Sequence, residues 1–142
     1  MLCLQCKTDT MKTLKQNKIS ELFYRVIKKE EQIDSLVKEI KKNNLNSSVK
    51  YAYKAFCCAM LSKNSDSYLQ KGKYIKQYGL FITKSFEANS NCIEARLIRL
   101  LIEQKLENVK FVNHTSEDLN FLNENYDSVE DNKLKEIISN II

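Results

Sequence analysis

The amino-acid sequence predicts an all-α fold of six or seven helices packed as antiparallel helical hairpins. Apolar residues recur at spacings of three and four along most of the chain, which is the period of an α-helix. The 142 residues contain no proline and only two glycines, too few turn-forming residues for an all-β or α/β chain of this length. We therefore expect a single α-helical domain over residues 11–142, preceded by a disordered leader over residues 1–10.

Residues 12–42 contain two apolar stripes in nearly the same helical phase. The first stripe covers residues 19–27 and the second covers residues 33–40, with the polar segment KKEEQ between them. One long helix or two short helices would fit this pattern. We favour two helices with a break near residues 29–31.

A loop and then a third helical segment are predicted next. The segment KKNNLNSS, residues 41–48, is polar and rich in turn-forming residues, so it predicts a loop. Ser47 or Ser48 is the expected N-cap of the helix that follows. Apolar residues at helical spacing continue that helix from residue 49 to residue 60.

The fourth segment predicts a long helix from about Ser67 to Phe86. It contains both glycines of the chain, Gly72 and Gly79, seven residues apart on one ridge. Because a glycine inside a helix costs up to about 1 kcal/mol, a pair at this spacing indicates a close helix–helix contact, with a kink as the alternative.

The last third of the chain predicts three further helices. The segment ANSN ends the long helix, and the next helix runs from Cys92 to about Leu106. The segment TSEDLNFLNENY predicts a short helix with Thr115 or Ser116 as its N-cap and acidic residues in its first turn. The segment SVEDNKLKEIISNII predicts the final helix, whose inward-facing residues are Leu134, Ile137, Ile138 and Ile141.

Charge is unevenly distributed along the chain. The net charge is +5, but residues 1–86 hold 17 basic and 7 acidic side chains, whereas residues 87–142 hold 6 basic and 11 acidic ones. This polarity would steer an anionic partner to the first half of the chain. It would equally let the two halves attract each other, within one molecule or between two molecules of a homo-oligomer.

Location is predicted from what the sequence lacks. No apolar run reaches the roughly 18 residues that a membrane span requires. The opening segment MLCLQCKTDTMK has neither the basic region nor the apolar core of a secretion signal. We expect a cytoplasmic location, no membrane contact and reduced thiols at the five cysteines.

The cysteines and the single histidine are the obvious candidates for metal or redox chemistry. Cys3 and Cys6 have the C-x-x-C spacing of a zinc or redox motif, but a structural zinc needs four ligands. The other possible ligands are Cys57, Cys58, Cys92 and His114. Adjacent cysteines on a helix point about 100° apart, and no third group completes a dyad of cysteine and histidine. We expect no catalytic, cofactor-binding or metal-binding residue.

Tyrosines and lysines interleave on the two middle helices. The candidate interaction surface consists of Tyr51, Lys54, Lys71, Tyr74 and Tyr78. Such a surface could stack on bases and bind phosphates, so a nucleic-acid-associated protein using residues 50–84 is the second functional hypothesis. We favour the alternative that the tyrosine rings pack between helices with their hydroxyls at the rim, which makes a nucleic-acid partner the less favoured one.

The segment NCIEARLIRLL places three charges in one of the most apolar runs of the chain. We interpret Glu94, Arg96 and Arg99 as a structural charge cluster. Glu94 lies three residues after Asn91, the spacing of a capping box. It is expected to bond the backbone near Asn91 or to pair with a basic side chain of an adjacent helix.

The segment ITKSFEANSNCIEARL resembles a helix-turn-helix repeat of the tetratricopeptide type. Ser85 stands at the small packing position, and residues 89–91 stand at the DPNN turn of that repeat. The sequence departs from the repeat where Ser90 replaces a proline, Arg96 replaces an aromatic residue and Leu100 replaces a small one. The resemblance implies an antiparallel helix pair with a groove for segments of partner proteins.

Residues 49–125 also resemble a group of uncharacterised bacterial helical-repeat-like proteins. The matching features are Tyr51–Lys63, Gly72–Lys73, Asn91–Arg99 and Glu117–Phe121. This resemblance implies a compact α-helical domain and no particular activity. We therefore expect a small protein–protein interaction or structural module without cofactor, whose protein partner the sequence does not name.

Overall fold

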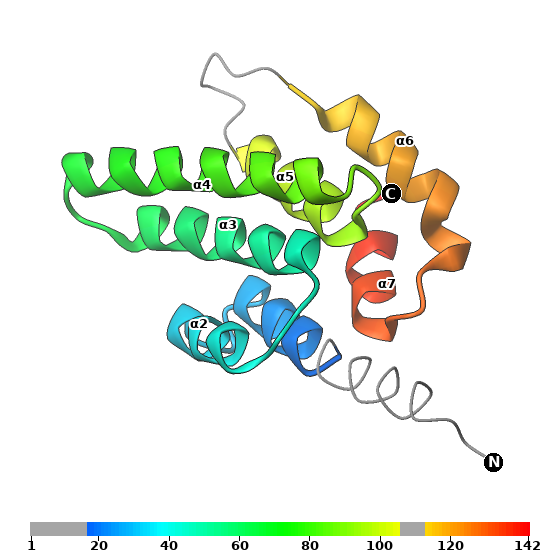
Figure 1. Ribbon diagram of the computed structural model, residues 1–142, viewed down its shortest axis with the longest axis horizontal. Helices are drawn as coiled ribbons and strands as arrows, with labels where there is room; N and C mark the ends of the chain where they lie inside the picture. The colour runs from blue at the N-terminus through cyan, green and yellow to red at the C-terminus, as the bar shows by residue number, and fades with distance from the viewer. Residues whose placement is uncertain (1–16, 106–112) are drawn as a thin grey trace.

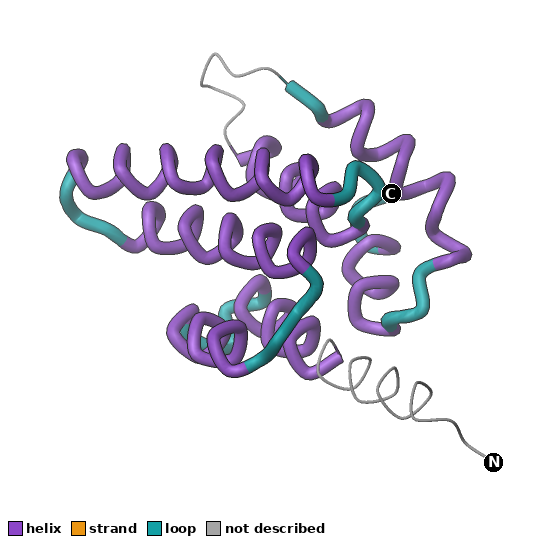
Figure 2. The backbone as a smooth tube through the Cα atoms, in the orientation of Figure 1, coloured by secondary structure: helices purple, strands orange, loops and turns teal. Residues whose placement is uncertain are grey.

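The computed structural model describes residues 17–105 and 113–142 (Figure 1). In these residues the chain forms seven α-helices and one short 3-10 helix, with no strand (Figure 2). The described part of the first helix covers residues 17–27. The other elements are α2 (Ile33–Lys42), α3 (Ser47–Asn64), α4 (Tyr68–Ala88), α5 (Ile93–Lys105), α6 (Thr115–Asn125), η1 (Tyr126–Ser128) and α7 (Asn132–Ser139). The predicted all-α fold is confirmed, whereas the predicted leader, residues 1–10, lies outside the described residues.

A turn separates the first helix from α2, so the predicted break near residues 29–31 is confirmed. The backbone of Lys29 has a φ of 62°, in the left-handed region that favours glycine. The amide of Lys29 donates to the carbonyl of Val26 at 3.1 Å, and the amide of Glu30 donates to that of Arg25 at 2.8 Å. This pair of bonds ends a helix by using a left-handed residue to satisfy its last carbonyls.

The cap of α3 differs from the prediction by one residue. Asn46, rather than Ser47 or Ser48, is the N-cap, and its Oδ1 accepts a hydrogen bond from the Ser48 amide at 3.2 Å. Asparagine is as good a cap as serine because its side-chain oxygen reaches the same free amide. The loop between α2 and α3 is therefore shorter than the segment predicted for it.

The helices α3 and α4 form a long antiparallel hairpin (Figure 1). Buried serine hydroxyls tie the two helices together at both ends. Near the connecting turn, Ser62 Oγ donates to the carbonyl of Lys71 at 3.0 Å. At the other end, Ser85 Oγ donates to the carbonyl of Ser48 at 2.6 Å. Ser85 is completely buried, which fits the small packing position that the repeat resemblance assigned to it.

Aromatic side chains fasten the first helix to α3 in the core. The ring of Phe23 meets Tyr53 edge to face, with centroids 5.4 Å apart and planes at 74°. It meets Phe56 in the same way at 4.7 Å and 89°. Edge-to-face pairs contribute about 0.5–1.5 kcal/mol beyond the area that they bury. The first helix therefore belongs to the same core as the long hairpin.

The helix α5 is enclosed by its neighbours, which suits one of the most apolar runs of the chain. Leu97, Ile98 and Leu100 are completely buried. The helix packs mainly against α3 and α6, and its contact with α4 is slight. The α4–turn–α5 segment is therefore not the close helix pair that the tetratricopeptide resemblance implies, because α3 occupies the packing surface of α4.

The two glycines of α4 do not lie at an internal helix contact, so that prediction is wrong. A Cβ atom placed on Gly72 or Gly79 would meet no atom within 4 Å. Neither glycine has a positive φ, so neither supplies an unusual backbone conformation. Helical spacing places both on the side of α4 that faces away from α3. Nothing in the described chain requires glycine at these positions.

Candidate functional site

Two arginines of α5 converge on one buried carboxylate of α6. Asp118 is completely buried. Arg99 Nε donates to Asp118 Oδ2 at 2.8 Å, and Arg99 Nη2 donates to Asp118 Oδ1 at 2.7 Å. Arg96 Nη1 donates to the same Oδ1 at 3.2 Å and to Glu117 Oε1 at 2.8 Å. Bidentate arginine–carboxylate pairs are strong and directional, so these four residues, the arginine clamp, join α5 to α6.

Phenylalanine rings cover the guanidinium groups of the arginine clamp. The Cζ of Arg99 lies 4.2 Å from the ring centroid of Phe86, and the Cζ of Arg96 lies 4.6 Å from that of Phe121. Burial acts to lower the pKa of Arg99, but the hydrogen bonds and charge of Asp118 outweigh burial and the pKa is raised. The Arg99 guanidinium is thus held in its charged form, and both arginines bond acidic side chains of α6, as in a structural joint.

Glu94 does not join Arg96 and Arg99, so the prediction of one three-residue cluster is corrected. An α-helix turns by about 200° over two residues, which places Glu94 on the opposite side of α5 from Arg96. There it lines a small cavity of about 70 Å³ together with Tyr53 and Asp131. The structural charge cluster consists instead of the two arginines with Glu117 and Asp118.

The local contacts of Glu94 also differ from the expected capping box. Asn89 Oδ1 accepts a hydrogen bond from the Asn91 amide at 2.9 Å, a position that Glu94 was expected to occupy. The Sγ of Cys92 lies 3.6 Å from Glu94 Oε2 and donates to it. No basic side chain of residues 17–105 and 113–142 forms an ion pair with Glu94. Burial is the main cause of a raised pKa for this carboxyl, and the charge of Asp131 adds to it.

The five residues predicted as an interaction surface do not share one exposed face. Tyr78 is only 5% exposed because it points into the core, and burial raises the pKa of its hydroxyl; its inclusion was wrong. Tyr51 and Lys54 lie together on α3, beside Phe81 of α4. Lys71 lines a cavity toward α5 instead, and Tyr74 is half-buried on α4.

The aromatic rings of Tyr51 and Phe81 stack on each other. Their centroids are 6.0 Å apart with an interplanar angle of 20°. The ammonium of Lys54 lies 6.0 Å from the Tyr51 centroid and that of Lys84 lies 5.5 Å from it. Lysines at this range are attracted to ring faces. The two rings and the two lysines therefore contact one another in a cluster on the surface of the hairpin.

Large apolar side chains are exposed along α4. Tyr68 is 91% exposed, Leu69 is 87% exposed and Leu80 is 57% exposed. At about 100° per residue, Leu69 and Leu80 lie on the same side of the helix as the two glycines and Lys76. We call this side the outer face of α4, defined by Leu69, Gly72, Lys76, Gly79 and Leu80.

His114 is held by a carboxylate of α5. Glu103 Oε2 accepts a hydrogen bond from the His114 amide at 2.7 Å, and Glu103 Oε1 lies 2.7 Å from His114 Nδ1. His114 is also the N-cap residue of α6, in place of the predicted Thr115 or Ser116, and Glu103 satisfies its amide from a neighbouring helix. In the described residues, His114 forms no hydrogen bond with Cys92, so the two do not make the cysteine–histidine dyad considered from the sequence.

The described cysteines are buried and free. Burial is the main cause that raises the pKa of Cys57 to about 12 and that of Cys92 to about 11. Burial also raises the pKa of Cys58. Thiols of this kind stay protonated at neutral pH and are poor nucleophiles and ligands. No group of three metal-ligating side chains lies together in the described residues, and the predicted C-x-x-C pair, Cys3 and Cys6, lies outside them.

Comparison of the chain with protein-family models, with curated proteins and with solved structures finds no match. No family is therefore identified for this all-helical chain, and the functional argument depends on its own residues. None of the helices in residues 17–105 and 113–142 is long and apolar enough to cross a membrane.

Proposed function

We propose that this chain is a small helical interaction module that binds a partner protein and has no catalytic activity of its own. The observation that carries the proposal is the outer face of α4. Leu69 and Leu80 are both more than half exposed there, on a helix whose other side is buried against α3. Packed antiparallel helix pairs, such as α3 with α4, can bind segments of other proteins.

The two glycines indicate what kind of surface binds there. A Cβ atom placed on Gly72 or Gly79 would meet no atom of a neighbouring element within 4 Å, and each glycine costs helix stability by about 1 kcal/mol relative to alanine. Small residues on a helix face let a partner backbone approach closely. Flanked by Leu69 and Leu80, they favour an elongated partner segment, such as a helix, lying along α4.

The charge of α4 indicates the composition of that partner. The helix contains the four lysines Lys71, Lys73, Lys76 and Lys84, and Glu87 is its one acidic residue. Opposite charges across an interface speed association and exclude wrong partners. Helical spacing places Lys73 and Lys76 on or beside the outer face. The favoured partner segment therefore carries apolar residues that meet the two leucines and acidic residues that meet these two lysines.

Affinity capture from the native cell with the double variant Leu69→Glu/Leu80→Glu tests the proposal. Both side chains are exposed, so the variant should fold as the wild type does. The matched control is Ile142→Glu, the same kind of change at another exposed apolar residue. We expect one protein to be retained by the wild type and the control and lost by the double variant. The captured protein, once purified, should bind the wild-type chain with an affinity that falls as the salt concentration is raised.

Two results would contradict this proposal. If all three baits retain the same proteins, the outer face of α4 is not a binding surface. If the wild type forms a dimer that the double variant loses, measured by light scattering, a second copy of the chain occupies the face instead of a different protein.

The second candidate function is nucleic-acid association through the cluster of Tyr51, Lys54, Phe81 and Lys84. It is supported by the ammonium groups of Lys54 and Lys84, which lie together beside the Tyr51 ring and could bind phosphates. Binding of a single-stranded oligonucleotide that weakens steeply with salt and is lost in Lys54→Met/Lys84→Met would support it. No binding at low salt would remove it.

A further inference from the structure

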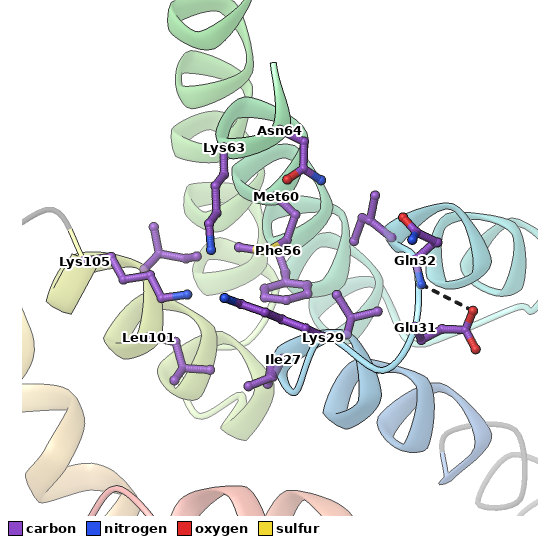
Figure 3. Close-up of a pocket in the computed structure, with 13 residues that line it drawn as sticks. Ile27, Lys29, Glu31, Gln32, Phe56, Met60, Lys63, Asn64, Leu101 and Lys105 are labelled. Atoms are coloured by element: carbon purple, nitrogen blue, oxygen red, sulfur yellow. Dashed lines mark hydrogen bonds between the residues drawn. The ribbon is translucent and has the colours of Figure 1, made fainter. Parts of the chain in front are cut away.

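A cavity lies where the first helix, α3 and α5 meet, away from the outer face of α4. Its volume is about 380 Å³, and its apolar walls include Phe56, Met60 and Leu101 (Figure 3). Small-molecule sites in proteins usually have volumes of about 300–1,000 Å³ and mostly apolar linings with a few convergent polar groups. The cavity therefore has the size of a ligand site, and its lining combines apolar walls with nearly as many polar residues.

Three exposed lysines from three separate elements line this cavity. Lys29 comes from the turn before α2, Lys63 from the last turn of α3 and Lys105 from the last turn of α5. Their ammonium groups point toward one another above Phe56 (Figure 3). Burial and then the charges of Lys63 and Lys29 lower the pKa of Lys105. We call the site formed by these three residues over Phe56 and Met60 the lysine cavity.

The positive charge of the lysine cavity is not neutralised by the described residues around it. None of the three lysines forms an ion pair within residues 17–105 and 113–142. Glu31 lines the cavity, but its carboxylate turns away from the lysines (Figure 3). It accepts hydrogen bonds from Ser35 Oγ at 2.8 Å and from the Gln32 amide at 3.3 Å, and Arg25 Nη2 lies 3.4 Å from it.

Lys29 differs from the other two lysines in its backbone conformation. Lysines at the end of a helix interact favourably with its dipole, which applies to all three. Lys29 in addition occupies a left-handed position, with a φ of 62°, where glycine is the usual residue. Backbone strain that persists beside a cavity points from the observed conformation to a functional use of the side chain.

We propose that the lysine cavity binds a small amphiphilic anion. Its carboxylate or phosphate group lies between the ammonium groups of Lys29, Lys63 and Lys105, and its apolar part lies against Phe56 and Met60. A second cavity of about 450 Å³ adjoins the first and offers further apolar walls for a longer molecule. The residues that line both cavities are Met60, Lys63, Ile102 and Lys105.

Isothermal titration of the full chain with octyl phosphate tests the proposal. Inorganic phosphate and octyl glucoside serve as separate probes, because the first lacks the apolar part and the second lacks the charge. We expect saturable binding of octyl phosphate, with each of the other two probes weaker by about tenfold or more, since a charge-assisted hydrogen bond and a buried alkyl chain each contribute that much.

Single substitutions then place the anion at the three lysines. Lys29→Met, Lys63→Met and Lys105→Met should each weaken octyl phosphate binding by about tenfold. The matched control is Lys41→Met, which removes the same charge from the last turn of α2 outside the cavity, and it should bind like the wild type. Lys29→Gly should weaken binding as Lys29→Met does while leaving the folded state intact, which separates ligand binding from stability.

Three results would overturn the proposal. The first is that octyl phosphate shows no saturable binding. The second is that inorganic phosphate or octyl glucoside binds as tightly as octyl phosphate. The third is that Lys41→Met weakens octyl phosphate binding as much as the three cavity variants do. Vesicles that contain phosphatidic acid identify the source of the anion. Vesicle binding that the three cavity variants lose assigns it to a membrane lipid, whereas octyl phosphate binding without vesicle binding assigns it to a soluble molecule.

Discussion

Both the backbone conformation of Lys29 and its charge are expected to lower the stability of the folded state. The left-handed conformation costs a residue with a Cβ about 1–2 kcal/mol, and three ammonium groups in one cavity repel each other. Lys29→Gly removes both costs, although glycine also gains freedom in the unfolded chain. We therefore expect this variant to raise the free energy of unfolding by about 1 kcal/mol, measured by urea denaturation in the absence of any added anion.

The neighbouring residue supplies the control for this prediction. Lys29 is the only described non-glycine residue with a positive φ, so Lys28 has no such strain to relieve. Lys28→Gly should not stabilise the protein, because it adds backbone freedom and removes the contact of the Lys28 ammonium with the Tyr24 ring. If both glycine variants destabilise the protein equally, Lys29 is not strained in the folded state.

Glu94 gives the fold a pH dependence of defined sign. Burial raises the pKa of its carboxyl above the ordinary 4.5, so the folded state holds the proton more readily than the unfolded state. The stability from this group is present below pH 4.5 and is lost as the pH rises through the raised pKa. Glu94→Gln should therefore raise the free energy of unfolding at neutral pH by about 1 kcal/mol and leave it nearly unchanged in acid.

Urea denaturation of wild type and Glu94→Gln across this pH range measures both parts of the effect. A variant that is less stable than the wild type at neutral pH would show that the carboxylate, rather than its protonated form, is stabilised in the folded chain. The structural interpretation of Glu94 would then be wrong.

Asp118 of α6 accepts hydrogen bonds from both arginines of α5 and so holds the two helices together. Asp118→Asn removes the charge that compensates two guanidinium groups, and breaking a buried ion pair costs about 3–5 kcal/mol. Glu117→Gln is the matched control, because Glu117 is the neighbouring acid but is 58% exposed. Exposed pairs contribute about 0–1 kcal/mol. Thermal unfolding should separate the two variants clearly, and equal small shifts would contradict the arginine clamp.

Sequence reasoning could place Arg96 and Arg99 in a structural cluster but could not find their partner. Asp118 appeared in the sequence as an ordinary acid in the first turn of a helix, and its burial depends on how α6 meets α5. Lys29 was likewise hidden, because a left-handed lysine has no signature in composition or periodicity. Residues whose roles come from long-range packing are the ones that local patterns miss.

At the scale of elements, α4 is the helix with the most to gain from substitution. Gly72→Ala and Gly79→Ala should each raise the free energy of unfolding by about 0.5–1 kcal/mol, because the added Cβ meets no atom and restricts the unfolded chain. The two gains should add in the double variant, measured by urea denaturation. Lower stability of either variant would show that the glycine serves a contact within the chain.

Helix positions were largely predictable, and their pairing was not. Periodicity located the break near residues 29–31 and the extent of α4 because burial of one helix face leaves a local signal. The glycines were assigned to an internal contact because sequence alone does not show which side of a helix remains uncovered. The close pair is α3 with α4, whereas the turn motif pointed to α4 with α5.

At the scale of the whole molecule, the buried thiols report on unfolding. Cys57 and Cys92 have pKa values raised to about 12 and about 11 by burial, so neither forms thiolate readily in the folded chain. In a Cys3→Ser/Cys6→Ser background, the remaining thiols should not react with an aromatic disulfide reagent at mildly alkaline pH. All of them should react in denaturant. Rapid reaction in native buffer would show that the core around α3 opens locally.

The two serine bonds of the α3–α4 hairpin have a mechanical consequence. Sliding one helix past the other by one turn, about 5.4 Å, would separate both hydroxyls from their carbonyl acceptors, since the bonds lie at opposite ends. The two bonds therefore fix the register of α3 against α4. Tyr68 and Phe86 lie near opposite ends of α4, and the Phe86 ring lies against Arg96 and Arg99. The fixed register of the hairpin therefore also fixes where α4 meets the arginine clamp.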